Sequence, residues 1–153
     1  MNSHGFTLVE LTVVIAVLAI FVSLCLPAFS AERDLQLTLA VQQFVADLYQ
    51  IQTLSECHGV ASLQYWNEAD RGRYNLYDNQ RFLRQVSLPR QVYFGADPVK
   101  VEYGNGWPVA GYTLQLESPQ SQYLQLVIVS LSTGRIRIVR QPRFPSGVTA
   151  HAR

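Results

Sequence analysis

A long uncharged segment near the start of the chain limits what this sequence can fold into. No charged residue lies between Leu11 and Ala31, and most side chains in the segment are apolar. A helix rises about 1.5 Å per residue, so about 20 such residues cross a hydrocarbon core of about 30 Å. The segment therefore predicts a helix that crosses a membrane once.

This helix differs from an ordinary secretory signal, which has a basic n-region and a cleavage site with small residues. Two residues within it also set it apart. Glu10 lies inside the apolar segment, and a carboxylate near a bilayer centre costs roughly 2.5–3.5 kcal/mol. That cost indicates a functional role with a cationic partner. Pro27 cannot donate to the helical ladder and predicts a bend or a loosened turn.

The hexapeptide Gly5-Phe6-Thr7-Leu8-Val9-Glu10 resembles the prepilin signature of type IV pilins and type II secretion pseudopilins. In that family a membrane peptidase cuts after the glycine, on the cytoplasmic side, and methylates the new N-terminal residue. The resemblance implies that residues 1–5 are a leader peptide, that cleavage follows Gly5, and that Phe6 is the mature N-terminus.

The same resemblance implies that Glu10 and Pro27 serve subunit assembly. A new α-amino group at Phe6 is a cation at neutral pH, and a buried carboxylate needs such a partner. In the family that partner is the amine of a neighbouring subunit. The competing interpretation is an accidental acid in the signal anchor of a simple surface protein, which would keep residues 1–5.

The chain beyond the apolar segment continues as an amphipathic helix. Apolar residues recur at spacings of three and four on one face, which is typical of a helix: Leu37, Val41, Phe44, Val45, Leu48 and Ile51. Polar residues fill much of the remainder: Gln36, Gln42, Gln43, Asp47, Gln50 and Gln52. No helix breaker separates Pro27 from Gly59, which is a plausible C-cap. We therefore expect one helix, with residues 6–29 in the membrane or filament core and residues 30–58 amphipathic.

After Gly59 the pattern changes to short runs of β-branched and aromatic residues separated by turn clusters. The predicted strands are Val60–Trp66, Tyr74–Tyr77, Arg81–Val86, Gln91–Phe94, Val99–Tyr103, Tyr112–Leu116, Tyr123–Leu131 and Arg135–Arg140. Apolar and polar residues alternate in several of them, which favours antiparallel sheets with one wet face. The sequence predicts an α+β fold in which residues 59–153 form an antiparallel sheet or small sandwich packed on the helix.

The last two predicted strands flank Ser132-Thr133-Gly134, a short turn that predicts a hairpin. Alternation places Arg135 and Arg137 on one face and Ile136 and Ile138 on the other. Between Ser118 and Arg153 the sequence has five arginines and no Asp or Glu, so the segment is locally positive.

Two interpretations of these arginines compete. Arg135, Arg137, Arg140 and Arg143 either form a solvated face with a basic tail, or bind the phosphates of DNA. The hairpin with its Gly134-Arg135-Ile136-Arg137 element resembles the GspH/FimT group of minor pilins and pseudopilins, and in FimT-like minor pilins a similar element is associated with DNA capture during natural transformation. The alternative is a GspH-like pseudopilin of a type II secretion system, without DNA binding.

Aromatic residues offer a weaker signal. Those that could stack on single strands are Tyr65, Trp66, Tyr93, Tyr103, Trp107, Tyr112, Tyr123 and Phe144, although most are expected in the core or in sheet pairs. The glycine-rich loop from Tyr103 to Pro108 is a candidate contact with a neighbouring subunit, and we assign no site to it.

Composition and motifs favour a non-enzymatic protein. The net charge of +1 gives no global attraction to nucleic acid. No nucleophile elbow, phosphate loop or paired metal-ligand spacing occurs, so we expect no catalytic residues, no metal and no cofactor. Cys25 and Cys57 lie about 32 residues apart on one expected helix, which is too far for a disulfide within the chain.

These features predict a minor pilin or pseudopilin. The expected partners are other pilin or pseudopilin subunits, the prepilin peptidase, the cytoplasmic membrane and, through the arginines, DNA. The expected location is the cytoplasmic membrane, crossed once with the globular part outside the cytoplasm, and then a pilus or pseudopilus filament.

Overall fold

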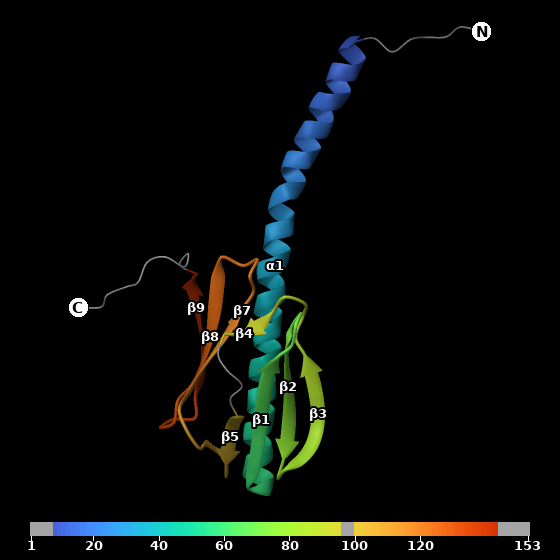
Figure 1. Cartoon of the computed structure of the whole chain (residues 1–153). Coiled ribbons are helices and arrows are strands. Elements are labelled where there is room, and N and C mark those ends of the chain that lie inside the picture. Colours follow the sequence, from blue (N-terminus) through green and yellow to red (C-terminus); the bar gives the residue numbers. More distant parts are fainter. Residues whose placement is uncertain (1–7, 96–99, 144–153) are drawn as a thin grey trace. The chain divides into compact units, whose positions relative to one another are not determined.

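A single helix begins the structure. The computed structural model describes residues 8–95 and 100–143, without the side chains of residues 24–33. Helix α1 runs over Leu8–His58 (Figure 1). The chain divides after Arg33 into two compact units, Met1–Arg33 and Asp34–Arg153.

In the first unit, the described side chains of α1 are apolar and exposed for the most part. Every residue from Leu8 to Ser23 is exposed, Glu10 among them. Among the described residues, no helix combines the length and the apolar character that a membrane span requires. The membrane crossing of residues 6–29 therefore stays a prediction.

In the second unit, α1 buries the face that its periodicity predicts. Leu37, Val41, Phe44, Leu48 and Ile51 are all buried, and the partly buried Val45 packs against them. The helix ends at His58 because Gly59 takes a φ of +91°, which favours glycine, and donates its N–H to Ser55 O at 2.9 Å. The expected C-cap is confirmed.

Within residues 59–95 and 100–143, nine strands follow in two antiparallel sheets. They are β1 (Val60–Asn67), β2 (Gly72–Asp78), β3 (Arg81–Ser87), β4 (Tyr93–Phe94), β5 (Lys100–Gly104), β6 (Trp107–Pro108), β7 (Tyr112–Glu117), β8 (Tyr123–Val129) and β9 (Ile136–Pro142). Sheet A has the order β3-β2-β1-β5-β6 and sheet B the order β4-β7-β8-β9. The chain thus moves from sheet A to sheet B after β3, returns at β5 and leaves again after β6.

Both sheets pack against the second part of α1 and share one core with it. The Phe44 ring lies 5.2 Å from that of Tyr74 in sheet A and 5.4 Å from that of Phe94 in sheet B, centroid to centroid. Figure 1 shows α1 beside both groups of strands in this unit. The predicted α+β class, with antiparallel sheets packed on the helix, is confirmed.

The structure corrects the sequence prediction at two places. Asp47, expected on the polar face of α1, is only 2% exposed. It accepts hydrogen bonds from Tyr74 Oη at 2.6 Å and from Arg84 Nη2, so two strands of sheet A supply the partners that its burial requires. The second place is the loop before Pro108, where Trp107 and Pro108 form the short strand β6.

Candidate functional site

The residues expected to act in processing and assembly lie at the start of the chain. Gly5 and Phe6 are outside the described residues. Glu10 lies in the first turn of α1 and is exposed. Pro27 falls within the bounds of α1, while its side chain is outside the described residues. The roles of these four residues stay predictions.

The predicted C-terminal hairpin is present and its register is defined. Strands β8 and β9 pair antiparallel, with Ile128 opposite Arg137 and Val127 opposite Ile138. In the turn, Ser130 N–H donates to Arg135 O at 3.0 Å. Gly134 takes a φ of +63° and donates to Ser130 O at 2.9 Å. Glycine favours this turn because it adopts the left-handed backbone conformation without the steric cost that a Cβ adds.

Strand β9 distributes its arginines over two faces of sheet B. Arg140 lies opposite Gln125, which is buried and donates to Thr38 of α1, so this face looks toward the helix. Arg137 is an odd number of residues away and therefore points to the opposite, outer face. Arg135 precedes β9 directly and is exposed. The four predicted DNA-binding residues do not form one continuous face.

Acidic residues from other elements pair with two of the four arginines. Arg140 Nη2 lies 3.2 Å from Asp34 Oδ2, and its guanidinium carbon lies 3.8 Å from the centre of the Tyr123 ring. Arg143 Nη2 lies 3.6 Å from Glu117 Oε2. The absence of acids between Ser118 and Arg153 predicted a positive cluster without a neutralising acid, and this prediction is wrong for Arg140 and Arg143.

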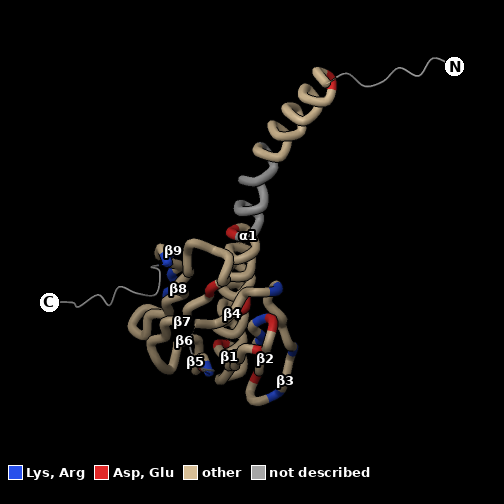
Figure 2. The backbone as a smooth tube through the Cα atoms, turned by 45° about the horizontal axis from the view of Figure 1, so that its top comes forward, with Lys and Arg blue, Asp and Glu red and all other residues tan. Residues whose placement is uncertain are grey.

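Arg135 and Arg137 differ from this pair. Both are exposed, and within residues 8–95 and 100–143 no carboxylate lies within ion-pairing distance of either guanidinium. Figure 2 shows basic positions along β9. Guanidinium groups that are free of carboxylates keep their five donors for phosphate oxygens, so these two residues are the candidate anion-binding element.

A second polar cluster joins α1 to sheet A and was not foreseen from the sequence. Asp47 accepts from Tyr74 and Arg84, and Arg84 Nη2 also donates to Gln50 Oε1 at 3.0 Å. Burial, together with the hydrogen bond to Asp47, raises the pKa of Tyr74 far above its usual range. The signal in the sequence was the position of Asp47, which directly precedes Leu48 and lies three residues after Phe44 in the apolar pattern.

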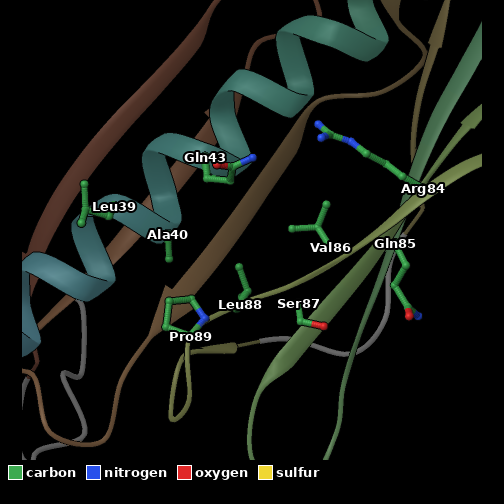
Figure 3. A pocket seen from close by; sticks show the side chains of 9 residues that line it. All are labelled: Leu39, Ala40, Gln43, Arg84, Gln85, Val86, Ser87, Leu88 and Pro89. Atoms are coloured by element: carbon green, nitrogen blue, oxygen red, sulfur yellow. The ribbon is translucent and has the colours of Figure 1, made fainter.

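Beside this cluster, a cavity of about 510 Å³ opens between α1 and β3 (Figure 3). Its lining is Leu39, Ala40, Gln43, Arg84, Gln85, Val86, Ser87, Leu88 and Pro89. Figure 3 shows Arg84 reaching from β3 toward the helix. This lining contains no histidine, cysteine or carboxylate that could activate the Ser87 hydroxyl. The cavity therefore does not combine a nucleophile with a general base.

Among the described residues, no group of three or more His, Cys, Asp or Glu side chains could hold a metal ion. Cys57 is a free, exposed thiol near the end of α1. The side chain of Cys25 is outside the described residues.

Comparison with known proteins identifies the start of the chain. Residues 1–26 match the family model of the prokaryotic N-terminal methylation motif. This match covers the Gly5-Phe6 junction and Glu10, and it supports a type IV pilin-like prepilin signal. No curated protein and no solved structure is significantly similar to the chain.

Proposed function

We propose that this chain, which carries a pilin-like prepilin signal in residues 1–26, is a minor pilin or pseudopilin of a type IV pilus-like filament. The match to the N-terminal methylation motif carries the proposal. An exposed apolar helix followed by an α+β unit supports it. Such a helix suits a subunit that is first held in the cytoplasmic membrane and then packs its apolar surface against other subunits.

Processing by the prepilin peptidase would create the group that Glu10 needs. Cleavage after Gly5 exposes the Phe6 amine, which is a cation at neutral pH. In an apolar filament core, a carboxylate is stable only when an opposite charge and hydrogen-bond donors accompany it. Glu10 of one subunit facing the Phe6 amine of its neighbour meets this requirement and fixes the stagger between the two helices.

Intact-mass measurement after co-expression with a prepilin peptidase tests this proposal. The wild-type chain should lose residues 1–5 and gain one methyl group on Phe6. Gly5→Val should block cleavage, whereas Ser3→Ala in the same leader should leave it unchanged. Glu10→Ala should be processed and yet fail to enter filaments. A wild-type chain that retains Met1–Gly5 would instead indicate a simple signal-anchored surface protein.

We further propose that Arg135 and Arg137 hold DNA on the filament, as in a competence pilus. Their exposure and the lack of a described carboxylate beside them support this role. Two phosphate contacts are few, so binding should be weak for one subunit and strongly dependent on salt. A filament that presents several copies would multiply the effect.

The full chain in detergent, titrated with duplex DNA over a series of salt concentrations, tests this second role. Arg135→Ala/Arg137→Ala should make the log-log salt slope shallower by about 0.9 for each phosphate that the variant no longer binds. Arg140→Ala/Arg143→Ala removes the same charge from residues that are paired with Asp34 and Glu117, and should change the slope less. Equal slopes for both variants, or no binding at low salt, would favour the pseudopilin of a type II secretion system.

A further inference from the structure

Trp107 is unusually exposed for a tryptophan. It is the first residue of β6, lies opposite Gly104 in the register of β5 and β6, and exposes 57% of its surface. Other aromatic residues named from the sequence, such as Tyr65 and Tyr103, are buried in the core. Exposing a large ring gives up the stabilisation that its burial would provide, so the position needs an explanation.

The backbone that presents Trp107 is fixed to the end of α1. Gln52 Nε2 donates to Gly106 O at 3.1 Å, and Gly106 N–H donates to Ser55 Oγ at 3.0 Å. Asn105 N–H donates to Gly59 O at 2.7 Å. Three hydrogen bonds therefore hold the residues before the tryptophan, which makes its ring a preorganised surface.

The indole borders Gly134, which directly precedes Arg135. A Cβ added at the buried Gly134 would lie 3.9 Å from Trp107 Cε3 and 3.8 Å from Pro108 Cδ. Arg135 is the next residue in the chain, and its exposed guanidinium has no carboxylate partner among the described residues. The backbone of Arg135 therefore lies next to the residue that Trp107 borders, and both side chains are exposed. We call this region the Trp107 surface (Trp107, Gly134 and Arg135).

An exposed aromatic ring near an arginine suits a single-stranded nucleic acid better than a duplex. A single-stranded nucleic acid offers unpaired bases that stack on a ring, and phosphates that bind a guanidinium. In a duplex the base faces are already stacked on each other, so only the phosphates are accessible to the arginine. We propose that the Trp107 surface binds single-stranded DNA, with one base stacked on Trp107 and an adjacent phosphate on Arg135. This inference rests on the proposed DNA-binding role of the arginines.

A nearby acid sets a limit on the affinity. Glu56 is exposed, and its Cγ lies 2.5 Å from the position that a Cβ on Gly106 would occupy, so its carboxylate lies beside the residue that precedes Trp107. A carboxylate at this place repels phosphate. Glu56→Gln should therefore strengthen the binding of both single strands and duplexes by about twofold.

The test is fluorescence anisotropy of the full chain in detergent, with a labelled oligothymidylate of about 12 nucleotides and a duplex of the same length. Trp107→Ala should weaken single-strand binding about 5- to 150-fold and duplex binding by less than twofold. Trp107→Tyr should retain most of the single-strand affinity, because a smaller ring still stacks. Arg135→Ala should weaken both.

An oligomer of the same length without bases isolates the stacking contribution. The wild-type chain should bind this abasic strand as weakly as Trp107→Ala binds the normal strand, and Trp107→Ala should cost nothing further on it. Trp107 is exposed, so its removal leaves no buried cavity and the variants should stay folded. Circular dichroism of each variant checks this.

The outcomes separate the two proposals. If Trp107→Ala binds both the duplex and the single strand as tightly as the wild type does, the inference is overturned. The proposal that the arginines bind DNA then still stands. Equal losses on single strands and duplexes overturn it as well. Loss of binding to anionic lipid vesicles in Trp107→Ala, with unchanged DNA affinity, would assign the surface to a membrane and overturn the inference. If the wild type binds neither DNA, both proposals fail.

Discussion

Asp47 shows how a single buried carboxylate joins the helix to a sheet. Its replacement by alanine leaves the buried Tyr74 hydroxyl without an acceptor and Arg84 without its anion. We expect Asp47→Ala to lower the free energy of unfolding by about 1–3 kcal/mol. Asp47→Ala/Tyr74→Phe should lose less than the sum of the two single variants, as measured by urea unfolding in detergent. Additive losses would show that the hydrogen bond contributes nothing.

Tyr103 makes stability depend on pH at the alkaline end. Burial, together with the nearby Tyr112 and Tyr49, raises its pKa to about 12. Between pH 10 and pH 12 the unfolded chain loses this proton while the folded chain keeps it, so the free energy of unfolding falls by about 1.4 kcal/mol per pH unit. Tyr103→Phe should reduce this alkaline loss of stability. Part of the loss should remain in the variant, because the pKa of Tyr74 is also raised.

The same variant has a second expected result at neutral pH. The Tyr103 hydroxyl is buried and finds no hydrogen-bond partner among the described residues. Removing a buried hydroxyl that lacks a partner costs nothing or stabilises. Thermal unfolding of Tyr103→Phe at pH 7 should therefore give a midpoint equal to or above that of the wild type. A midpoint lowered by several degrees would indicate a partner for this hydroxyl.

At the scale of elements, the β5–β6 turn offers a sharp comparison between two glycines. Gly106 has a φ of +83°, and a Cβ there would meet the Glu56 side chain. A Cβ at Gly104 has no contact closer than 4.0 Å. Gly106→Ala should cost about 1–2 kcal/mol and alter the fluorescence of Trp107, whereas Gly104→Ala in the same hairpin should cost less. Equal costs would show that neither backbone strain nor Glu56 matters.

Elements with a clear period or a clear turn could be predicted from the sequence, and contacts between elements could not. The spacing from Leu37 to Ile51 predicted the buried face of α1, and Gly134 marked the β8–β9 turn. The burial of Asp47 depends on Tyr74 and Arg84, which are far away along the chain. The pairing of Arg140 with Asp34 likewise depends on how sheet B packs against the helix, which no local pattern contains.

The whole second unit should unfold as one body, because a single residue supports both sheets. Phe44 contacts Tyr74 of sheet A and Phe94 of sheet B. Phe44→Ala should lower the free energy of unfolding by about 3–5 kcal/mol, and amide hydrogen exchange in β1 and β8 should accelerate together. Phe82→Ala is the matched control, because Phe82 is 53% exposed and should cost less than about 1 kcal/mol. Faster exchange in only one sheet would contradict a shared core.

The strands β3 and β9 each stand at one end of the strand order of a sheet, and they affect how the protein behaves at high concentration. Each leaves one row of backbone groups outside the described ladders, and such rows can template the growth of fibrils. Arg81 and Arg84 stand on β3, Arg137 and Arg140 stand on β9, and Pro142 supplies no N–H. Two copies that approach edge to edge at β9 must bring their Arg137 side chains close together, and Pro142 cannot donate a ladder bond. We therefore expect these edges to disfavour amyloid-like stacking at high local density.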